Sequence, residues 1–443
     1  MSATLKLWWL LRRRAGEHGD SHRLVERLAI LAFAVMTAIM LVVIGGYGAF
    51  ADRSEGATGD ATLYPLMAGT AMALLMVPLI TLGGAAARLA VARRDARMAT
   101  IRLMGGRTTQ VGTLTALDAI AQALIGGILG IGGYFALLPL VRLIVFQNDP
   151  FSFAELLVPW AVLPVTVLGV VLVALLSAGA SLRSVVVTPL GVAQRVSGNP
   201  LHWSRLIPAA LVVGVFIVLL RMNRLEILMA SVLLVMGLAV LNLVGPFVMS
   251  LIGQIWAGCA SRVTTLIAAR RVVDAPKTAW RSVGGVGLAT FIAGLVAALA
   301  SVTDVDGGTA ELAMLTDDMV TGGFLTLGIA GILAGVSTGV MQAGRVIDQA
   351  GTYRALSFAG TDLQVMDRAR MSETAIPLVA TVALSAGMSA LFLLPILGTG
   401  MLTQPGVLIE FTLSVLGACV LVLAGAFASR GVVRTVLAGP RST

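Results

Sequence analysis

The sequence predicts an all-α polytopic membrane protein, with about ten transmembrane helices arranged as two parallel four-helix repeats joined by two linking helices. Three observations support this fold class: an apolar composition, a series of long apolar stretches, and a one-sided distribution of basic residues. Of the 443 residues, 58% are hydrophobic and 12% are charged, and the mean hydropathy is +0.95. Soluble proteins carry roughly 25% charged residues. This chain therefore cannot cover a soluble globule, and its surface must face lipid.

Ten apolar stretches approach or exceed the length of about 20 residues that a membrane-spanning helix needs. The first has too long an apolar run for a cleavable signal peptide, so it is interpreted as a span. The predicted spans are residues 28–50, 66–91, 114–146, 157–182, 207–220, 227–255, 283–302, 319–342, 375–397 and 407–428.

The basic residues favour one topology. With the N-terminus inside and spans that alternate in direction, 27 of the 31 basic residues fall in inner segments. Only Arg53, Arg142, Arg221 and Arg224 fall elsewhere. Inner loops of membrane proteins carry this excess of positive charge, so both termini are expected to be cytoplasmic. The same bias explains the net charge of +9 without nucleic acid as a partner.

The outer connections are short, which predicts that no large extracytoplasmic domain is present. They are expected at about residues 52–63, 147–156, 221–226, 303–318 and 398–406. The fourth is expected to be an acidic loop, because it contains Asp304, Asp306, Glu311, Asp317 and Asp318.

An internal repeat organises the chain. Gly106 and Gly360 are 254 residues apart; each follows a small residue and precedes a Gln-Val pair, Gln110-Val111 or Gln364-Val365. Two linking spans leave both halves in the same orientation, which predicts parallel repeats around an axis along the membrane normal. The expected segments are a cytoplasmic amphipathic segment (1–27), the first repeat (28–200), the linking spans (201–256), an interfacial amphipathic segment (257–282) and the second repeat (283–443).

The segment after the second span is predicted to project into the cytoplasm. No proline or glycine interrupts residues 88–103, and Gly105-Gly106 then favours a helix end. The result would be a long helix that ends in a tight turn, here called an elbow, on which a cytoplasmic motor protein could act. An ordinary basic inner loop is the alternative.

Little in the sequence favours catalysis by this chain. No Walker A pattern is present, and His18, His22 and His202 form no metal-ligand or nucleophile pattern. No catalytic residue and no metal site is therefore expected. Cys259 and Cys419 are too far apart in sequence for a redox or zinc motif.

Acidic residues that ion-coupled transport would need are placed near the span ends, at Asp118, Glu226, Glu373 and Glu410. Glycines at four-residue spacing predict close helix packing, either static or sliding. They are Gly126 and Gly130 on the third span, and Gly331, Gly335 and Gly339 on the eighth.

Two stretches carry a family resemblance. Residues 93–111, which end in Ile-Arg-Leu-Met-Gly-Gly-Arg-Thr-Thr-Gln-Val, resemble the FtsX-like permease domain of ABC transporters. So do residues 181–195, which include Thr188-Pro189-Leu190. The resemblance implies a MacB-like permease that binds a separate ATPase dimer on the cytoplasmic face through coupling segments. The implied contacts are Arg94, Arg97, Ile101, Arg102, Gly105 and Gly106 in the first half, and Arg354, Leu356, Ala359 and Gly360 in the second.

The resemblance implies a permease subunit in the bacterial plasma membrane, surrounded by lipid. No cofactor is expected in this chain, since ATP and Mg would be bound by the partner ATPase. With no large outer domain, the expected cargo is an amphipathic or hydrophobic peptide, lipid or drug, which is exported or extracted. An ion-coupled secondary exporter is the alternative, as is a membrane regulator that binds an ATPase but transports nothing.

Overall fold

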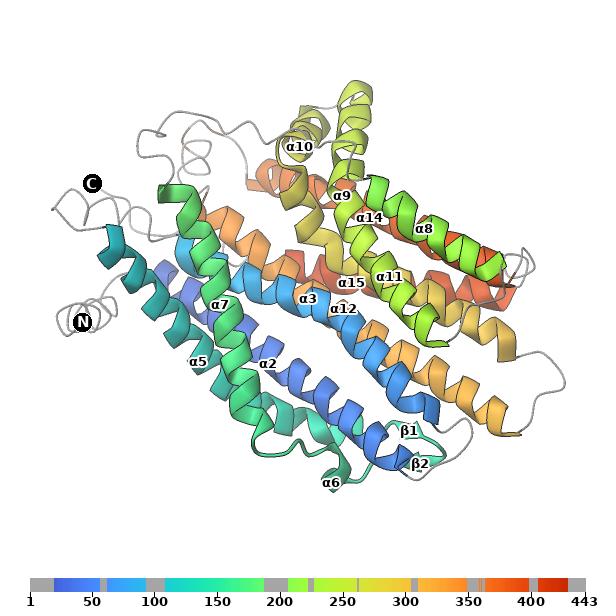
Figure 1. The fold of residues 1–443 in the computed structure, drawn as a ribbon. Helices are drawn as coiled ribbons and strands as arrows, with labels where there is room; N and C mark the ends of the chain where they lie inside the picture. The colour runs from blue at the N-terminus through green and yellow to red at the C-terminus, as the bar shows by residue number, and fades with distance from the viewer. Residues whose placement is uncertain are drawn as a thin grey trace.

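The computed structural model describes residues 20–55, 62–92, 108–186, 206–221, 227–260, 263–303, 310–348, 363–397 and 405–428, together with residues 358 and 360. Nearly all of this part of the chain is helical (Figure 1). The long helices of the N-terminal part are α2 (Asp20–Ser54), α3 (Tyr64–Ala92), α5 (Thr108–Val141) and α7 (Val162–Val186). Next come α8 (Leu206–Arg221), α9 (Ile227–Cys259) and the short α10 (Val263–Asp274). The C-terminal part contains α11 (Pro276–Thr303), α12 (Ala310–Asp348), α14 (Leu363–Leu397) and α15 (Pro405–Ala428).

The described helices confirm an all-helical chain with several candidate membrane spans. Seven are long and apolar enough to cross a membrane, and Ala210–Leu219 and Phe411–Phe427 are shorter apolar helices. Large apolar side chains such as Leu168, Leu413 and Val420 are exposed on their surfaces, as expected for side chains that face lipid. The seven candidates are Glu26–Ser54, Tyr64–Leu89, Gly112–Val141, Val162–Gly179, Leu234–Cys259, Met314–Val346 and Thr374–Phe392.

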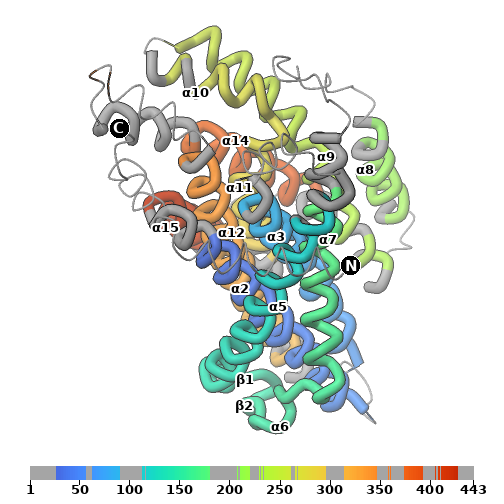
Figure 2. Tube along the Cα trace, turned by 90° about the vertical axis from the view of Figure 1, so that its left-hand side faces the viewer, coloured from blue at the N-terminus to red at the C-terminus, as the bar shows by residue number. Residues whose placement is uncertain are grey.

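The long helices form two packed groups, visible in Figures 1 and 2. In the first group α2 packs on α3 and α5, and α7 packs on the same two helices. In the second group α11 packs on α12, α14 and α15, and α12 also packs on α15. The two groups meet chiefly where α3 contacts α12, while α9 contacts α11 and α14. Helices α3 and α12 therefore form the centre of the molecule.

The connection between α5 and α7 differs from its prediction. Helix α5 ends at Val141, shortly after Pro139, whereas the third span was predicted to continue to residue 146. A hairpin follows, with β1 (Val145–Phe146) paired antiparallel to β2 (Asp149–Pro150). Both residues of its turn, Gln147 and Asn148, have φ near +58°, as in the two-residue turns that match the twist of a hairpin.

The fourth span was likewise predicted too early, at residue 157. A one-turn helix, α6 (Phe153–Leu156), occupies part of this connection, and α7 begins only at Val162. Ser152 and Glu155 cap α6 reciprocally, so the local sequence fixes a turn rather than the start of a span. We refer to residues 142–161 as the strap.

The acidic segment 303–318 was predicted to be a loop, but part of it is helical. Helix α12 begins at Ala310, which places Glu311, Asp317 and Asp318 on its first three turns. The sequence from Ala310 to Leu315 is rich in good helix formers, and Asp318 is buried with two hydrogen-bond partners. Residues 304–309 lie outside the described part of the chain.

The predicted interfacial segment 257–282 contains α10, whose buried face (Ala268, Ala269 and Val272) packs on α9 and α14. The predicted boundaries at 256 and 282 fall inside α9 and α11. Residues 1–19, most of the predicted N-terminal amphipathic segment, lie outside the described residues. The two-repeat organisation of the whole chain stays a prediction.

Candidate functional site: an apolar cavity between the two helix groups

A cavity of about 410 Å³ lies where the two helix groups meet. It is at the end of the bundle that holds the strap, which the distribution of basic residues predicts to be the outer end. Its walls come from α2, α3, α9, α11 and α12, and Phe146 and Phe151 of the strap complete them. The volume falls in the range of about 300–1,000 Å³ that small-molecule sites occupy.

The lining is largely apolar, with a few hydroxyl groups and one carboxyl group. Asp318, on α12, is the one Asp, Glu, Lys, Arg or His among the described lining residues. The deeper wall is formed by aliphatic side chains such as Leu74, Leu234, Ile292 and Ile329. Burial of a carboxylate in such surroundings is costly unless hydrogen bonds stabilise it.

Two hydrogen bonds stabilise Asp318. The Tyr64 hydroxyl, at the start of α3, donates to Asp318 Oδ2 at 2.6 Å. The backbone N–H of Gln147, in the turn of the strap, donates to the same oxygen at 2.8 Å. Asp318 therefore joins three parts of the molecule: α12, α3 and the strap. The strap makes a further contact with α12 from Asn148 Nδ2 to Met314 Sδ at 3.5 Å.

Aromatic rings cluster beside this carboxylate. The ring of Phe50 stacks on that of Tyr64 with centroids 5.7 Å apart, and it meets Phe146 and Phe151 edge to face at 5.2 Å each. These four rings line the cavity together with Tyr47. Such pairs contribute about 0.5–1.5 kcal/mol each beyond the area they bury, so they hold the strap against α2 and α3.

Arg53, at the end of α2, anchors the strap from its other side. Its guanidinium donates to the backbone oxygens of Phe146 and Pro150 at 3.2 Å each, and to Glu155 Oε2 at 2.9 Å. It also lies 4.3 Å above the centre of the Phe151 ring. A planar guanidinium suits several acceptors and a ring face at once.

The electrostatics of Glu155 follow from this contact. Partial burial raises the pKa of the Glu155 carboxyl, but hydrogen bonds from Arg53 and Ser152 outweigh that effect and hold the pKa below its ordinary value. The carboxylate is thus kept charged opposite Arg53.

Tyr134 fixes the far end of the strap. Its side chain is fully buried on α5, and its hydroxyl donates to the backbone oxygen of Leu156 at 2.6 Å. The same hydroxyl accepts from the N–H of Val158 at 3.1 Å. The strap is therefore a packed structure with fixed ends.

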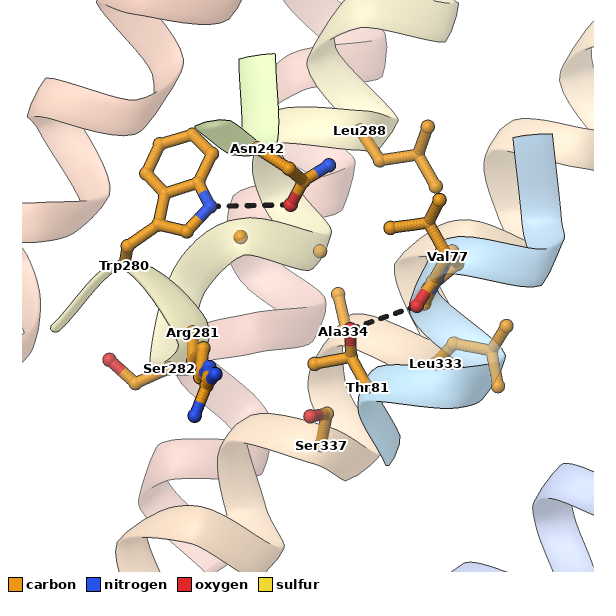
Figure 3. A pocket seen from close by; sticks show the side chains of 13 residues that line it. Val77, Thr81, Asn242, Trp280, Arg281, Ser282, Leu288, Leu333, Ala334 and Ser337 are labelled. Atoms are coloured by element: carbon orange, nitrogen blue, oxygen red, sulfur yellow. Dashed lines mark hydrogen bonds between the residues drawn. The ribbon is translucent and has the colours of Figure 1, made fainter. Parts of the chain in front are cut away.

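A second, much smaller crevice of about 30 Å³ lies between α3, α9, α11 and α12 (Figure 3). Trp280 donates from its indole N–H to Asn242 Oδ1 at 3.3 Å on one side of it. Arg281 and Ser337 also line it, and the buried Ser337 hydroxyl has no protein partner. A polar crevice of this size has room for water rather than for a ligand.

Most residues of the two predicted coupling elbows cannot be placed. Arg94, Arg97, Ile101, Arg102, Gly105 and Gly106 lie outside the described residues, as do Arg354, Leu356 and Ala359. Gly360 is described, and its φ of +83° is in the left-handed region that favours glycine. It stands just before α14, with open space where a Cβ would be.

The five predicted packing glycines all lie at close helix contacts. A Cβ on Gly126 or Gly130 of α5 would lie 2.5 Å from a Cβ of α2, that of Phe33 or Thr37. On α12, a Cβ at Gly331 or Gly335 would lie 2.8 Å from atoms of Leu421 on α15, and one at Gly339 would lie 3.1 Å from Gly425 O. The α2–α5 contact lies within the first helix group and the α12–α15 contact lies within the second, so neither contact joins the two groups.

The acids singled out from the sequence are not the ones at the cavity. Asp118 is half-buried on α5, and the side chains of Glu226, Glu373 and Glu410 lie outside the described set. Asp318, expected in an outer loop, is the functional candidate that sequence reasoning missed. One signal could have found it: Tyr64 and Asp318 are 254 residues apart, the same spacing as Gly106 and Gly360.

In the part of the chain that the structure describes, no group of three or more His, Cys, Asp or Glu side chains is arranged to hold a metal ion. The fold and the site together define a multi-span helical membrane protein with an apolar cavity between two helix groups.

Comparison with known families gives the next step. Residues 66–190 match the family model of the FtsX-like permease C-terminal domain, so this segment is similar to that domain, and the resemblance found in the sequence is confirmed. The match covers nearly all of α3, then α5, the strap and α7. No curated protein and no solved structure matches the chain.

Proposed function

We propose that this chain is the permease subunit of an ABC-type transport system. A separate MacB-type ATPase dimer on the cytoplasmic face would power it, with ATP and Mg bound by the ATPase. It would export or extract an amphipathic or hydrophobic substrate. The observation that carries the proposal is the apolar cavity of about 410 Å³ at the junction of α3 and α12, next to a permease domain that begins on α3.

The arrangement of α3 and α12 suits a mechanical coupling role. One end of each helix contributes to the cavity, through Tyr64 and Asp318. The opposite ends, at Ala92 and Asp348, lead directly into the two predicted elbows. At 1.5 Å per residue, the 29 residues of α3 span roughly 44 Å. A displacement of an elbow by the ATPase would therefore reach the cavity through a single helix.

The packing also supports two equivalent halves. The first and third long helices of each group, α2 with α5 and α11 with α14, pack together, and α3 meets its counterpart α12 between the groups. A permease with two equivalent inner surfaces suits a partner that is itself a dimer.

The first test is co-purification. The full chain, co-expressed with any Walker-type ATPase that a neighbouring gene encodes, is expected to retain that ATPase through affinity purification. Reversal of two charges in the first elbow, Arg94→Glu with Arg97→Glu, should abolish retention; Arg142→Glu, on the strap, is the control and should not. A chain that never retains an ATPase would refute the proposal.

A second experiment separates transport from regulation. The complex in lipid vesicles should hydrolyse ATP faster when an amphiphile is added and should move that amphiphile across or out of the bilayer. ATP turnover that no amphiphile stimulates, without transport, would indicate a regulator. Transport driven by an ion gradient in the absence of ATPase would indicate a secondary exporter.

A further inference from the structure

We propose that the cavity binds cationic amphiphiles, molecules with an ammonium head group and a hydrocarbon tail, with Asp318 and the surrounding aromatic rings as the head-group site. This inference rests on the proposed function for the idea that the cavity takes cargo, and it deepens that function by naming the class. It is carried by the position of one carboxylate in a largely apolar cavity.

The first step concerns charge. Asp318 is the one charged residue among the described residues that line the cavity, and it is 9% exposed. Both of its hydrogen-bond donors, Tyr64 and the Gln147 N–H, approach the same oxygen, Oδ2. Both donors are neutral, so neither of them is a counter-ion for the carboxylate. A carboxylate held by neutral donors attracts a cation and disfavours an anion.

The second step concerns the rings. Tyr47, Phe50, Tyr64, Phe146 and Phe151 all line the cavity. Aromatic faces attract alkylammonium groups, and binding sites for such groups are built from several rings. The arginine that touches this cluster, Arg53, is ion-paired with Glu155 at 2.9 Å and is not among the lining residues. It therefore does not neutralise Asp318.

The third step concerns the tail. From Tyr64 to Leu75, α3 lines the cavity over a stretch of 12 residues, whose ends are roughly 16 Å apart along the helix. Away from Asp318 the wall is aliphatic, with Leu74 and Leu75 facing a cavity shared with Leu234 and Ile292. A ligand with its ammonium group at Asp318 has room to bury an apolar tail toward the centre of the bundle.

The test measures binding to the purified full chain in a neutral maltoside detergent, without ATPase and without ATP. Three probes share one tail length: dodecyltrimethylammonium, dodecanol and dodecanoate. The Ala71→Phe variant, which fills the cavity, provides the baseline for partition into the micelle. We expect the cation to bind wild type at least roughly tenfold more tightly than the neutral or anionic probe.

The Asp318→Asn variant isolates the charge, because an amide keeps the size of the side chain and still accepts hydrogen bonds from Tyr64 and Gln147. It should lose the preference for the cation, with a rise in Kd of roughly tenfold or more, and should still bind dodecanol as wild type does. Dodecanol binding and the thermal unfolding midpoint report that the variant is folded. The matched control Asp317→Asn removes an exposed carboxylate on the same helix and should bind the cation normally.

Equal affinity of wild type for all three probes would overturn the proposal. So would an Asp318→Asn variant that binds the cation as tightly as wild type. Because no ATPase is present, this outcome is independent of the co-purification test. If the cation binds but no ATPase is retained, the permease proposal fails and the binding site stands. If an ATPase is retained but the cation does not bind preferentially, the binding site fails and the permease proposal stands. Competition by phosphatidylethanolamine, which is zwitterionic and shares only the ammonium group with the cationic probe, would point to a membrane lipid as the source of that group. Its failure to compete would favour a ligand with net positive charge; in either case the ammonium group is the chemistry recognised.

Discussion

The hydroxyl of Tyr64 and the carboxylate of Asp318 form a 2.6 Å hydrogen bond between α3 and α12, at the strap end of the contact between the two helix groups. Both side chains are more than 90% buried. The bond therefore closes one end of the α3–α12 junction, while the opposite ends of the two helices lead to the predicted elbows.

We predict that Tyr64→Phe lowers stability without removing the ring from the aromatic cluster. A hydrogen bond to a charged acceptor contributes about 1.5–3 kcal/mol, so the thermal unfolding midpoint in detergent should fall measurably. The double variant with Asp318→Ala, which removes the acceptor, should lose less than the sum of the two single losses, because the two residues share one interaction. Strictly additive losses would show that the bond is absent in solution.

Glycine packing gives a second prediction. In Gly130→Leu, the new Cβ would lie 2.5 Å from Thr37 Cβ and 2.6 Å from the Ala34 carbonyl oxygen, so α2 and α5 must separate. Overpacking of this kind costs about 1–3 kcal/mol or more. The control Gly132→Ala places a Cβ on the same helix with nothing within 4 Å. Thermal unfolding of the two variants should differ sharply, and equal midpoints would contradict the α2–α5 contact.

The left-handed backbone conformation at Gly360 gives a third prediction. At a φ of +83°, a β-branched residue is strained by about 1–2 kcal/mol whatever space surrounds it. Gly360→Val should therefore distort the second elbow and reduce ATP turnover coupled to transport in the reconstituted complex. Gly360→Asn is the matched variant, because asparagine tolerates the left-handed region far better. Wild-type coupling in both variants would remove Gly360 from the elbow hypothesis.

The ion pair that holds the strap gives a fourth prediction, which concerns acidic pH. The pKa of Glu155 is lowered in the folded chain, so its ion pair with Arg53 stabilises the strap fully above the ordinary glutamate pKa of 4.5. That contribution is lost as pH falls through the lowered folded value. The protection factors of the strap amides, such as those of Ile144 and Leu157, which compare the measured exchange with the intrinsic rate at the same pH, should therefore fall at acidic pH in wild type.

The Glu155→Gln variant provides the comparison for this pH effect. It should show lower protection factors at neutral pH and little further change in them on acidification, because the titrating group is gone. Arg53→Lys should resemble it, since an ammonium cannot make the set of contacts that the guanidinium makes. If wild type and Glu155→Gln had the same pH profile, the ion pair would not hold the strap.

The helices were predictable because lipid imposes them. Ten apolar stretches coincide largely with ten helices, since a backbone surrounded by hydrocarbon must satisfy its own hydrogen bonds. Errors fell where side chains interact over long distances. The end of α5 at Val141 and the start of α12 at Ala310 depend on the strap and on the partners of Asp318, and neither is visible in local hydropathy.

The site was harder to predict for a related reason. The positions of the charged residues in the sequence predicted an acidic segment on the outer side. They did not show that the side chain of Asp318 is buried while that of its neighbour Asp317 is exposed. The aromatic cluster joins Phe50, Tyr64, Phe146 and Phe151 from three separate segments, so no local motif announces it. The coupling residues came from family resemblance, and the first elbow remains a prediction.

The pairing of Tyr64 with Asp318 bears on why two halves would be fused into one chain. On the predicted 254-residue register, the two residues occupy the same position in each half. In a homodimer of identical halves, the residue at this position would face the same residue of the other copy across the symmetry axis. Tyrosine would then face tyrosine, or aspartate would face aspartate. Neither pairing places a hydroxyl donor opposite a single carboxylate. Fusion frees the two copies to diverge, so that one half supplies the acid and the other supplies its donor and the strap. A cavity built this way has different chemistry on its two sides, so an asymmetric ligand would bind in it in one orientation only.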